Sequence, residues 1–234
     1  MTQRNERVAL EPIAKHLAGA RVRGRAPADA SVRLAGKRIA LTVVALSPQA
    51  SHARRSARPS LRLDRVALEV VSRVRTAIQR QVPADRTIVV TISAPIRLAA
   101  KTAAALSSRV LNRVSGRARA ERSLHRIHGN RIEIWILQGG IATTSKLVGF
   151  VHNPDVDPRI FIEVTRALLA AIGPHRRAAA RRSGARWLLF ENHGDRLPIE
   201  TYRNVCQQLR LGTAFERLFV ALPDGGIERL RSCG

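Results

Sequence analysis

The apolar residues of this chain occur in short aliphatic runs, and arginine-rich segments separate the runs. Phe, Trp and Tyr make up only 3% of the 234 residues, whereas hydrophobic residues make up 45%. A core of this composition must be built from Leu, Val, Ile and Ala. The runs, of which Ile39–Leu46 is typical, are too short to cross a bilayer. The pattern therefore predicts a chain that folds around an aliphatic core.

Two kinds of run alternate along the chain, which is typical of an α/β fold. Apolar and β-branched runs predict strands over Ile39–Leu46, Thr87–Ser93, Arg131–Leu137, Leu147–Val151, Arg186–Glu191, Phe215–Leu222 and Ile227–Leu230. Helices are predicted over Leu61–Val82, Leu98–Val114, Arg159–Ile172 and Pro198–Leu209. The first helix places Leu63, Val66, Ala67, Val70, Val71, Val74, Ala77, Ile78 and Val82 on one inner arc. We expect a mixed β-sheet flanked by helices over residues 61–234, preceded by a basic, partly flexible region with a linker over residues 1–60.

Positive charge far exceeds negative charge. The chain has 37 Arg and 4 Lys against 17 acidic residues, a formal net charge of +24. Residues 1–150 carry 28 basic and 8 acidic groups, a net of +20, and residues 151–234 carry only +4. A GC-rich genome would favour arginine over lysine, but it does not explain why acids are so few. The charge therefore indicates a polyanionic partner.

Three arginine-rich segments read as loops, over Ser47–Ser60, Gly116–Ser123 and Gly173–Gly184. Glu121 is the only acid in them. A guanidinium group grips phosphate oxygens in two places, so these segments are candidate nucleic-acid contacts. Solubilising loops shaped by codon usage are the alternative. The candidate contacts are Arg54, Arg55, Arg58, Arg117, Arg119, Arg122, Arg176, Arg177, Arg181 and Arg182.

The spacing His125-x-x-His128 suits a metal site only if further ligands are present, and no cysteine pair supplies them. Phosphate-facing or loop histidines are the better interpretation. The two cysteines, Cys206 and Cys233, form no disulfide framework, which favours a reducing compartment. We expect a cytoplasmic protein without a membrane span.

Two groups of acids follow predicted strands. Asp155 and Asp157 come after the strand at 147–151, and Glu191 ends the strand at 186–191. Carboxylates at strand ends can hold Mg²⁺ and orient water for phosphodiester cleavage. The alternative is that Asp155 and Asp157 favour the N-terminus of the following helix.

The order of these elements resembles the core of the PD-(D/E)XK nuclease superfamily. Pro154-Asp155 matches the Pro-Asp of that family, and Glu191 matches the carboxylate of its Glu-x-Lys, with His193 in place of the lysine. The resemblance implies a divergent or decayed Mg²⁺-dependent nuclease, with Asp155 and Glu191 as metal ligands and His193 as general base or proton donor.

The leading expectation from the sequence is a protein that binds DNA or RNA without strong sequence preference. No helix-turn-helix, zinc-finger or ribonucleoprotein motif is present in the sequence to read bases. The alternatives are the Mg²⁺-dependent nuclease, and an adaptor that docks acidic proteins or anionic surfaces.

Overall fold

The chain is an α/β protein, as the sequence predicts, but its strands form two mixed sheets and not one. It forms two compact units: unit 1 comprises residues 1–50 and 170–234, and unit 2 comprises residues 51–169. The computed structural model describes residues 16, 21–23, 30–46, 65–116, 121–138, 145–152, 161–170, 186–192, 199–210, 215–222 and 225–230.

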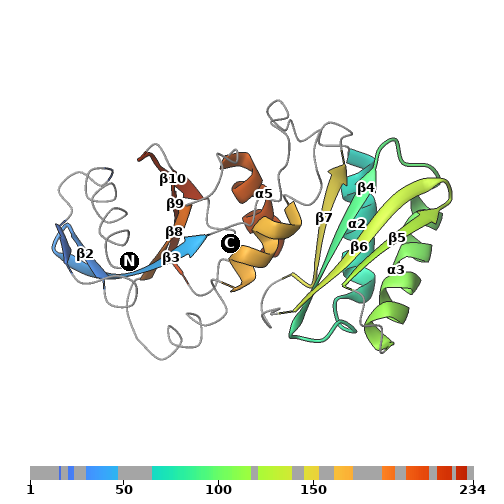
Figure 1. Ribbon diagram of the computed structural model, residues 1–234, viewed down its shortest axis with the longest axis horizontal. Helices are drawn as coiled ribbons and strands as arrows, with labels where there is room; N and C mark the ends of the chain where they lie inside the picture. The colour runs from blue at the N-terminus through green and yellow to red at the C-terminus, as the bar shows by residue number, and fades with distance from the viewer. Residues whose placement is uncertain are drawn as a thin grey trace. The chain divides into compact units, whose positions relative to one another are not determined.

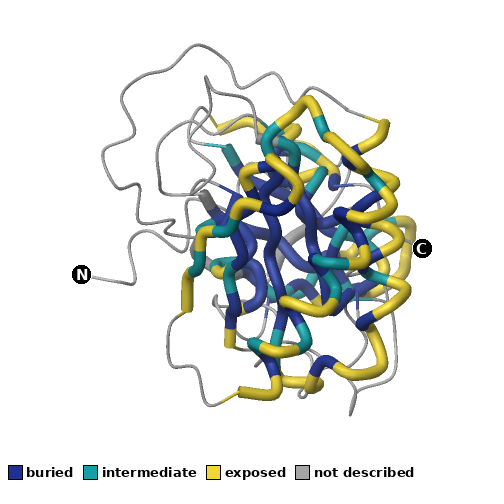
Figure 2. Tube along the Cα trace, turned by 90° about the vertical axis from the view of Figure 1, so that its right-hand side faces the viewer, coloured by how far each residue is buried: buried dark blue, intermediate teal, exposed yellow. Residues whose placement is uncertain are grey.

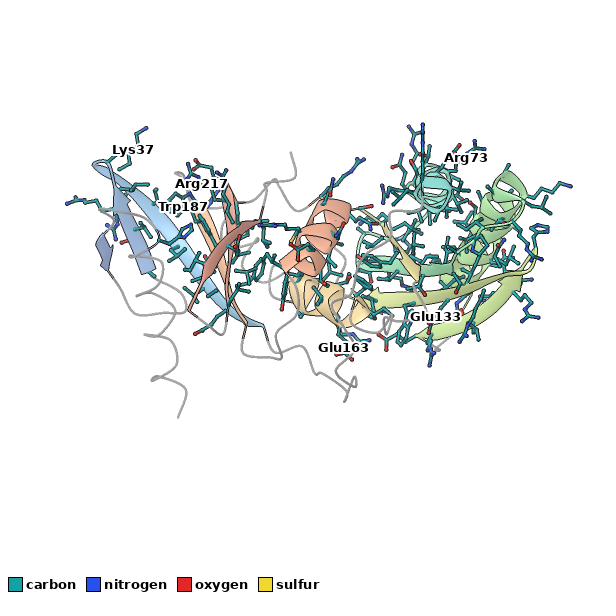
Figure 3. The ribbon with its side chains drawn as sticks, turned by 90° about the horizontal axis from the view of Figure 1, so that it is seen from above. Lys37, Arg73, Glu133, Glu163, Trp187 and Arg217 are labelled. Atoms are coloured by element: carbon teal, nitrogen blue, oxygen red, sulfur yellow. The ribbon has the colours of Figure 1, made fainter. Side chains whose placement is uncertain are left out.

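Unit 2 contains a four-stranded sheet in the order β5-β6-β4-β7. Its elements are α2 (Arg65–Ile78), β4 (Arg86–Ser93), α3 (Ala99–Ser115), β5 (Arg122–Ile127), β6 (Asn130–Gln138), β7 (Leu147–His152) and a helix over residues 161–170. The central strand β4 is antiparallel to β6 and parallel to β7, and β5 pairs with β6 as an antiparallel hairpin. Figure 3 shows α2 and α3 on one face of this sheet and Glu133 on the other.

Alternate residues of each strand point toward α2 and α3, and in unit 2 these residues are aliphatic. Strands β4 and β6 supply Ile88, Val90, Ile92, Ile132, Ile134 and Ile136, which pack against Val70, Val74, Leu106 and Val110 of the helices. On the opposite face, Phe150 of β7 stacks on Phe161 with ring centroids 4.5 Å apart. Figure 2 shows the buried strands at the centre of this unit.

Unit 1 contains a six-stranded sheet in which the strands follow chain order. Its elements are β1 (Arg21–Arg23), β2 (Ala30–Leu34), β3 (Lys37–Leu46), β8 (Arg186–Asn192), α5 (Ile199–Leu209), β9 (Arg217–Ala221) and β10 (Ile227–Leu230) (Figure 1). Strands β3, β8 and β9 are parallel, and the hairpins at both ends of the sheet are antiparallel. The first and last parts of the chain therefore build one sheet, although the sequence predicts a separate region over residues 1–60.

The core of unit 1 centres on Trp187, with Leu41, Leu189 and Phe219 around it. The Arg217 guanidinium lies over the Trp187 ring, 5.0 Å from its centroid. Such a cation covers the edge of the core while its charge stays near water.

The predicted strands β3, β4, β6, β7, β8, β9 and β10 are all present, with bounds that differ by a few residues. Three details are wrong. The predicted loop over Gly116–Ser123 ends in strand β5, which begins at Arg122. Two members of the predicted inner arc of α2, Val66 and Ala77, are exposed because the helix buries a narrower stripe. The sequence predicts no strand at β1, β2 or β5.

Candidate nucleic-acid interface

Of the site residues predicted from the sequence, the structure describes Glu191 and Arg122. The others lie outside the described residues: Asp155, His193, Arg54, Arg55, Arg58, Arg117, Arg119, Arg176, Arg177, Arg181 and Arg182.

Glu191 is buried near the end of β8, between Ala45 of β3 and Ala221 of β9 in the sheet register. Strand β7, which precedes Asp155, belongs to the other sheet. Within the described parts of the chain, no three His, Cys, Asp or Glu side chains are grouped to hold a metal ion. The nuclease site therefore stays a prediction.

Arg122 lies in strand β5 and already has a partner. Its guanidinium forms an ion pair with the Glu133 carboxylate and lies 5.4 Å from the centroid of the Trp135 ring. The Glu133 side chain is only 8% exposed, whereas that of Arg122 is 45% exposed. Arg122 thus neutralises a buried carboxylate while part of the guanidinium still faces solvent.

Basic side chains surround the β5–β6 hairpin of unit 2. We call this set the hairpin surface: Arg97, Lys101, Arg109, Arg113, Arg122, His125, Arg126, His128 and Arg131. The residues come from α3 and the turn before it, from both faces of β5, and from the start of β6. Arg122 is among the arginine contacts predicted from the sequence, and His125 and His128 are the histidines interpreted there as phosphate-facing or loop residues. Arg109, Arg113, Arg126 and Arg131 lie outside the three segments predicted as loops, and the sequence does not predict them as contacts.

Asn130 fixes the hairpin to the beginning of α3. Its Oδ1 accepts a hydrogen bond from the Arg97 N–H at 2.8 Å, and its Nδ2 donates to the Arg97 carbonyl and to Thr102 Oγ1, both at 2.9 Å. The Thr102 hydroxyl in turn donates to the Arg97 carbonyl at 2.9 Å. This network sets the Arg97 side chain beside the hairpin turn.

His125 connects α3 with the helix-facing side of β5. Arg109 donates to its Nδ1 at 3.2 Å, and Nε2 lies 2.9 Å from Ser123 Oγ, so the ring is held from both sides. Burial lowers the pKa of the His125 imidazole, and the positive charges of Arg109 and Arg113 lower it further. The neutral ring accepts a hydrogen bond that an imidazolium could not.

Acids near the hairpin surface are engaged in ion pairs. Glu133 pairs with Arg122, and Glu121 pairs with Arg166 of the helix over residues 161–170. Within the described residues, no acidic side chain pairs with Arg109, Arg126 or Arg131. Arg126 and Arg131 face each other across the hairpin, and both are exposed.

Aromatic side chains are not offered to solvent. All eight Phe, Trp and Tyr residues lie in the described part of the chain, and seven are buried. The eighth, Trp135, is half-buried, with the Arg122 guanidinium near its ring. The hairpin surface therefore offers cations, and not aromatic rings, to a ligand.

Among the described residues, no helix is long and apolar enough to cross a membrane. Comparisons with protein-family models, with curated proteins and with solved structures find no match to this chain.

Proposed function

We propose that this protein binds nucleic acid through the phosphate backbone, without strong sequence preference. The observation that carries the proposal is the hairpin surface, where cations gather and the nearby carboxylates are engaged by Arg122 and Arg166. Residues 94–131 contain nine Lys or Arg and one acid. Such a surface repels itself in the free protein and is stabilised when phosphates replace its counter-ions.

The aromatic residues favour a double-stranded ligand. Proteins that hold single strands stack the bases on exposed aromatic rings, and the eight aromatic residues here are buried or, for Trp135, lie under a guanidinium. Phosphate contacts that lack base stacking suit a duplex, whose bases are already stacked. Unit 1 contributes exposed cations of the same kind at Arg33, Lys37 and Arg38. The arginines at 54–58, 117–122 and 176–182, predicted from the sequence as phosphate contacts, would add further contacts of the same kind.

The test is a titration of the full chain with labelled DNA and RNA duplexes and with the corresponding single strands, repeated over a salt series. We expect the duplexes to bind more tightly than the single strands. The logarithm of the affinity should fall with the logarithm of salt concentration, with a slope of about −0.9 for each phosphate contacted on DNA. Absence of binding to every duplex at about 0.05–0.1 M salt would overturn the proposal.

An acidic polypeptide of matched charge is the control in this titration. A nucleic-acid-binding protein shows a defined site size along a duplex and discriminates against the polypeptide, because guanidinium groups match phosphate geometry. Equal affinity for both polyanions would instead indicate an adaptor for acidic surfaces.

A further inference from the structure

Each unit carries the same short sequence pattern on one of its hairpins. Residues 33–39 read Arg-Leu-Ala-Gly-Lys-Arg-Ile, and residues 126–132 read Arg-Ile-His-Gly-Asn-Arg-Ile. Both follow the pattern arginine, aliphatic residue, any residue, glycine, any residue, arginine, isoleucine. The first connects β2 with β3 in unit 1, and the second connects β5 with β6 in unit 2.

The two segments also have the same backbone conformation. The central residues of both turns have positive φ: 47° and 77° at Ala35 and Gly36, and 48° and 80° at His128 and Gly129. Two consecutive positive φ angles define the type I′ turn of a two-residue hairpin. The turns are closed by the register pairs Leu34↔Lys37 and Ile127↔Asn130.

The next register pair in each hairpin consists of two arginines, Arg33↔Arg38 and Arg126↔Arg131. The closing pair of such a turn is hydrogen-bonded. The arginine pair therefore takes the following non-hydrogen-bonded position, where Cβ atoms are about 4.5–5.5 Å apart. All four arginines are exposed.

Buried isoleucines fix this arrangement. Ile39 follows Arg38 and is 6% exposed, and Ile132 follows Arg131 and is fully buried. A slip of one residue would bring an arginine into the core, so each pair is held face to face on the solvent side. Like charges directly opposite on a sheet are destabilising, and the chain nevertheless places the same pair twice.

We propose that each hairpin is a phosphate clamp, in which the two facing guanidinium groups grip one backbone phosphate of the nucleic acid. This inference rests on the proposed function and assigns one such contact to each unit. A phosphodiester has two non-bridging oxygens, and each arginine presents a planar fork that suits such oxygens. The phosphate removes the repulsion that the free hairpin carries.

The surroundings of both pairs favour an anion. In unit 2, the side chain of Arg97 lies against the turn, with Cδ and Nη1 3.8 Å from the position that a Cβ on Gly129 would occupy. The nearest acid on the face of Arg126 and Arg131 is Glu133, which Arg122 neutralises. In unit 1, Lys37 stands exposed beside the turn, and the next register pair on the face of Arg33 and Arg38 is the uncharged Ser31↔Ala40.

Two double variants test the clamps, Arg33→Gln with Arg38→Gln and Arg126→Gln with Arg131→Gln. The matched control is Arg65→Gln with Arg80→Gln, which removes two exposed arginines that have no acidic partner among the described residues. Each clamp variant should lower the affinity for a DNA duplex at least about tenfold, as expected for lost hydrogen bonds to a charged group. Each should also make the salt slope shallower by about 0.9, the value for one phosphate. The control should change the slope by much less.

A double-mutant cycle separates a shared phosphate from two independent charges. If both arginines grip one phosphate, Arg126→Gln or Arg131→Gln alone should cause most of the loss, so the two effects are not additive. Thermal unfolding of each variant checks that the fold is retained.

The outcomes distinguish this inference from the proposed function. If the wild-type protein binds duplexes and the clamp variants change the affinity and the salt slope no more than the control does, the arginine pairs do not bind phosphate. The clamps are then rejected, and the proposal of nucleic-acid binding stands. If the two arginines of a pair contribute additively, the shared phosphate is rejected. If the wild-type protein binds no nucleic acid, the proposed function fails and the clamps fail with it.

Discussion

The side-chain amide of Asn130 is hydrogen-bonded to both main-chain polar groups of Arg97, the N–H at 2.8 Å and the carbonyl at 2.9 Å. Asn130 is 3% exposed and also donates to Thr102 Oγ1. One buried side chain therefore joins the β5–β6 hairpin to the N-terminal end of α3. It also determines where Arg97 stands relative to the proposed clamp of unit 2.

We expect Asn130→Ala to lower the free energy of unfolding by about 1–3 kcal/mol, because it removes three hydrogen bonds and leaves the Arg97 N–H without its Asn130 acceptor. Urea denaturation measures this change, and hydrogen exchange should show faster opening of the hairpin. The control is Asn112→Ala on the exposed side of α3, which should change stability by less than about 0.5 kcal/mol. Equal stability of the two variants would contradict the anchoring role of Asn130.

The contact between Gly149 and Val71 allows α2 to lie close to β7. A Cβ added at Gly149 would be 2.3 Å from Val71 Cγ2 and 2.5 Å from Cγ1, so the helix would have to shift. We expect Gly149→Ala to destabilise unit 2 by about 1–3 kcal/mol. Val71→Ala should be destabilising alone and yet relieve part of the Gly149→Ala effect, a favourable coupling that a double-mutant cycle in urea would detect. Additive losses would show that the clash is absorbed elsewhere.

The sequence predicts the interior strands well because their residues are aliphatic on both faces. Strand β4, with six consecutive buried residues from Thr87 to Ile92, is the clearest case. The sequence does not predict strand β5, because it is an edge strand in which Ile127 is the one buried residue and arginines are interspersed with polar and apolar side chains. Its turn, His128-Gly129, also lacks the Asn or Asp that usually signals a two-residue hairpin.

The candidate site was only partly accessible from sequence. Arg122 was identified, but its pairing with Glu133 depends on the register between β5 and β6. Arg126 and Arg131 lie opposite each other because of the same register, which the two-residue turn His128-Gly129 sets. Likewise, the pairing of Leu41 with Trp187 joins strands separated by the whole of unit 2, and no local pattern encodes such a contact.

Two arginines on the same face of β5 should have opposite effects on stability. Arg122→Gln leaves the buried Glu133 carboxylate without its guanidinium and should cost about 1 kcal/mol, since Arg122 is itself half exposed. Arg126→Gln removes one of two facing cations and should increase stability by about 0.2–1 kcal/mol.

Salt separates these two effects on stability. Urea unfolding at about 0.01 M and about 1 M salt compares weak with nearly complete screening of exposed charges. The gain from Arg126→Gln should disappear at high salt, whereas the loss from Arg122→Gln should largely persist because Glu133 is buried. Loss of stability in Arg126→Gln at low salt would show that the facing arginines do not repel each other.

His125 should make the stability of unit 2 depend on pH. Burial, Arg109 and Arg113 lower its folded-state pKa below the ordinary value of 6.5, so the unfolded chain takes up the proton first as pH falls. Stability should therefore be greatest above about 6.5 and should decline as the pH falls from there toward the lowered pKa. His125→Gln should flatten this part of the profile, and the exposed His128→Asn serves as the control that keeps it.

Bound nucleic acid should raise the pKa of the same imidazole. A phosphate bound beside Arg109 would offset the positive charges that disfavour the His125 imidazolium, and its pKa should rise. Binding then takes up a proton, and the affinity for a duplex should increase as pH falls from about 7 to below 6.5. Titrations of the wild type and of His125→Gln in two buffers of different protonation enthalpy measure this uptake. The contrary result is a wild-type affinity that does not depend on pH, together with equal proton uptake by the wild type and by His125→Gln. It would mean that the bound phosphates lie away from the helix-facing side of β5.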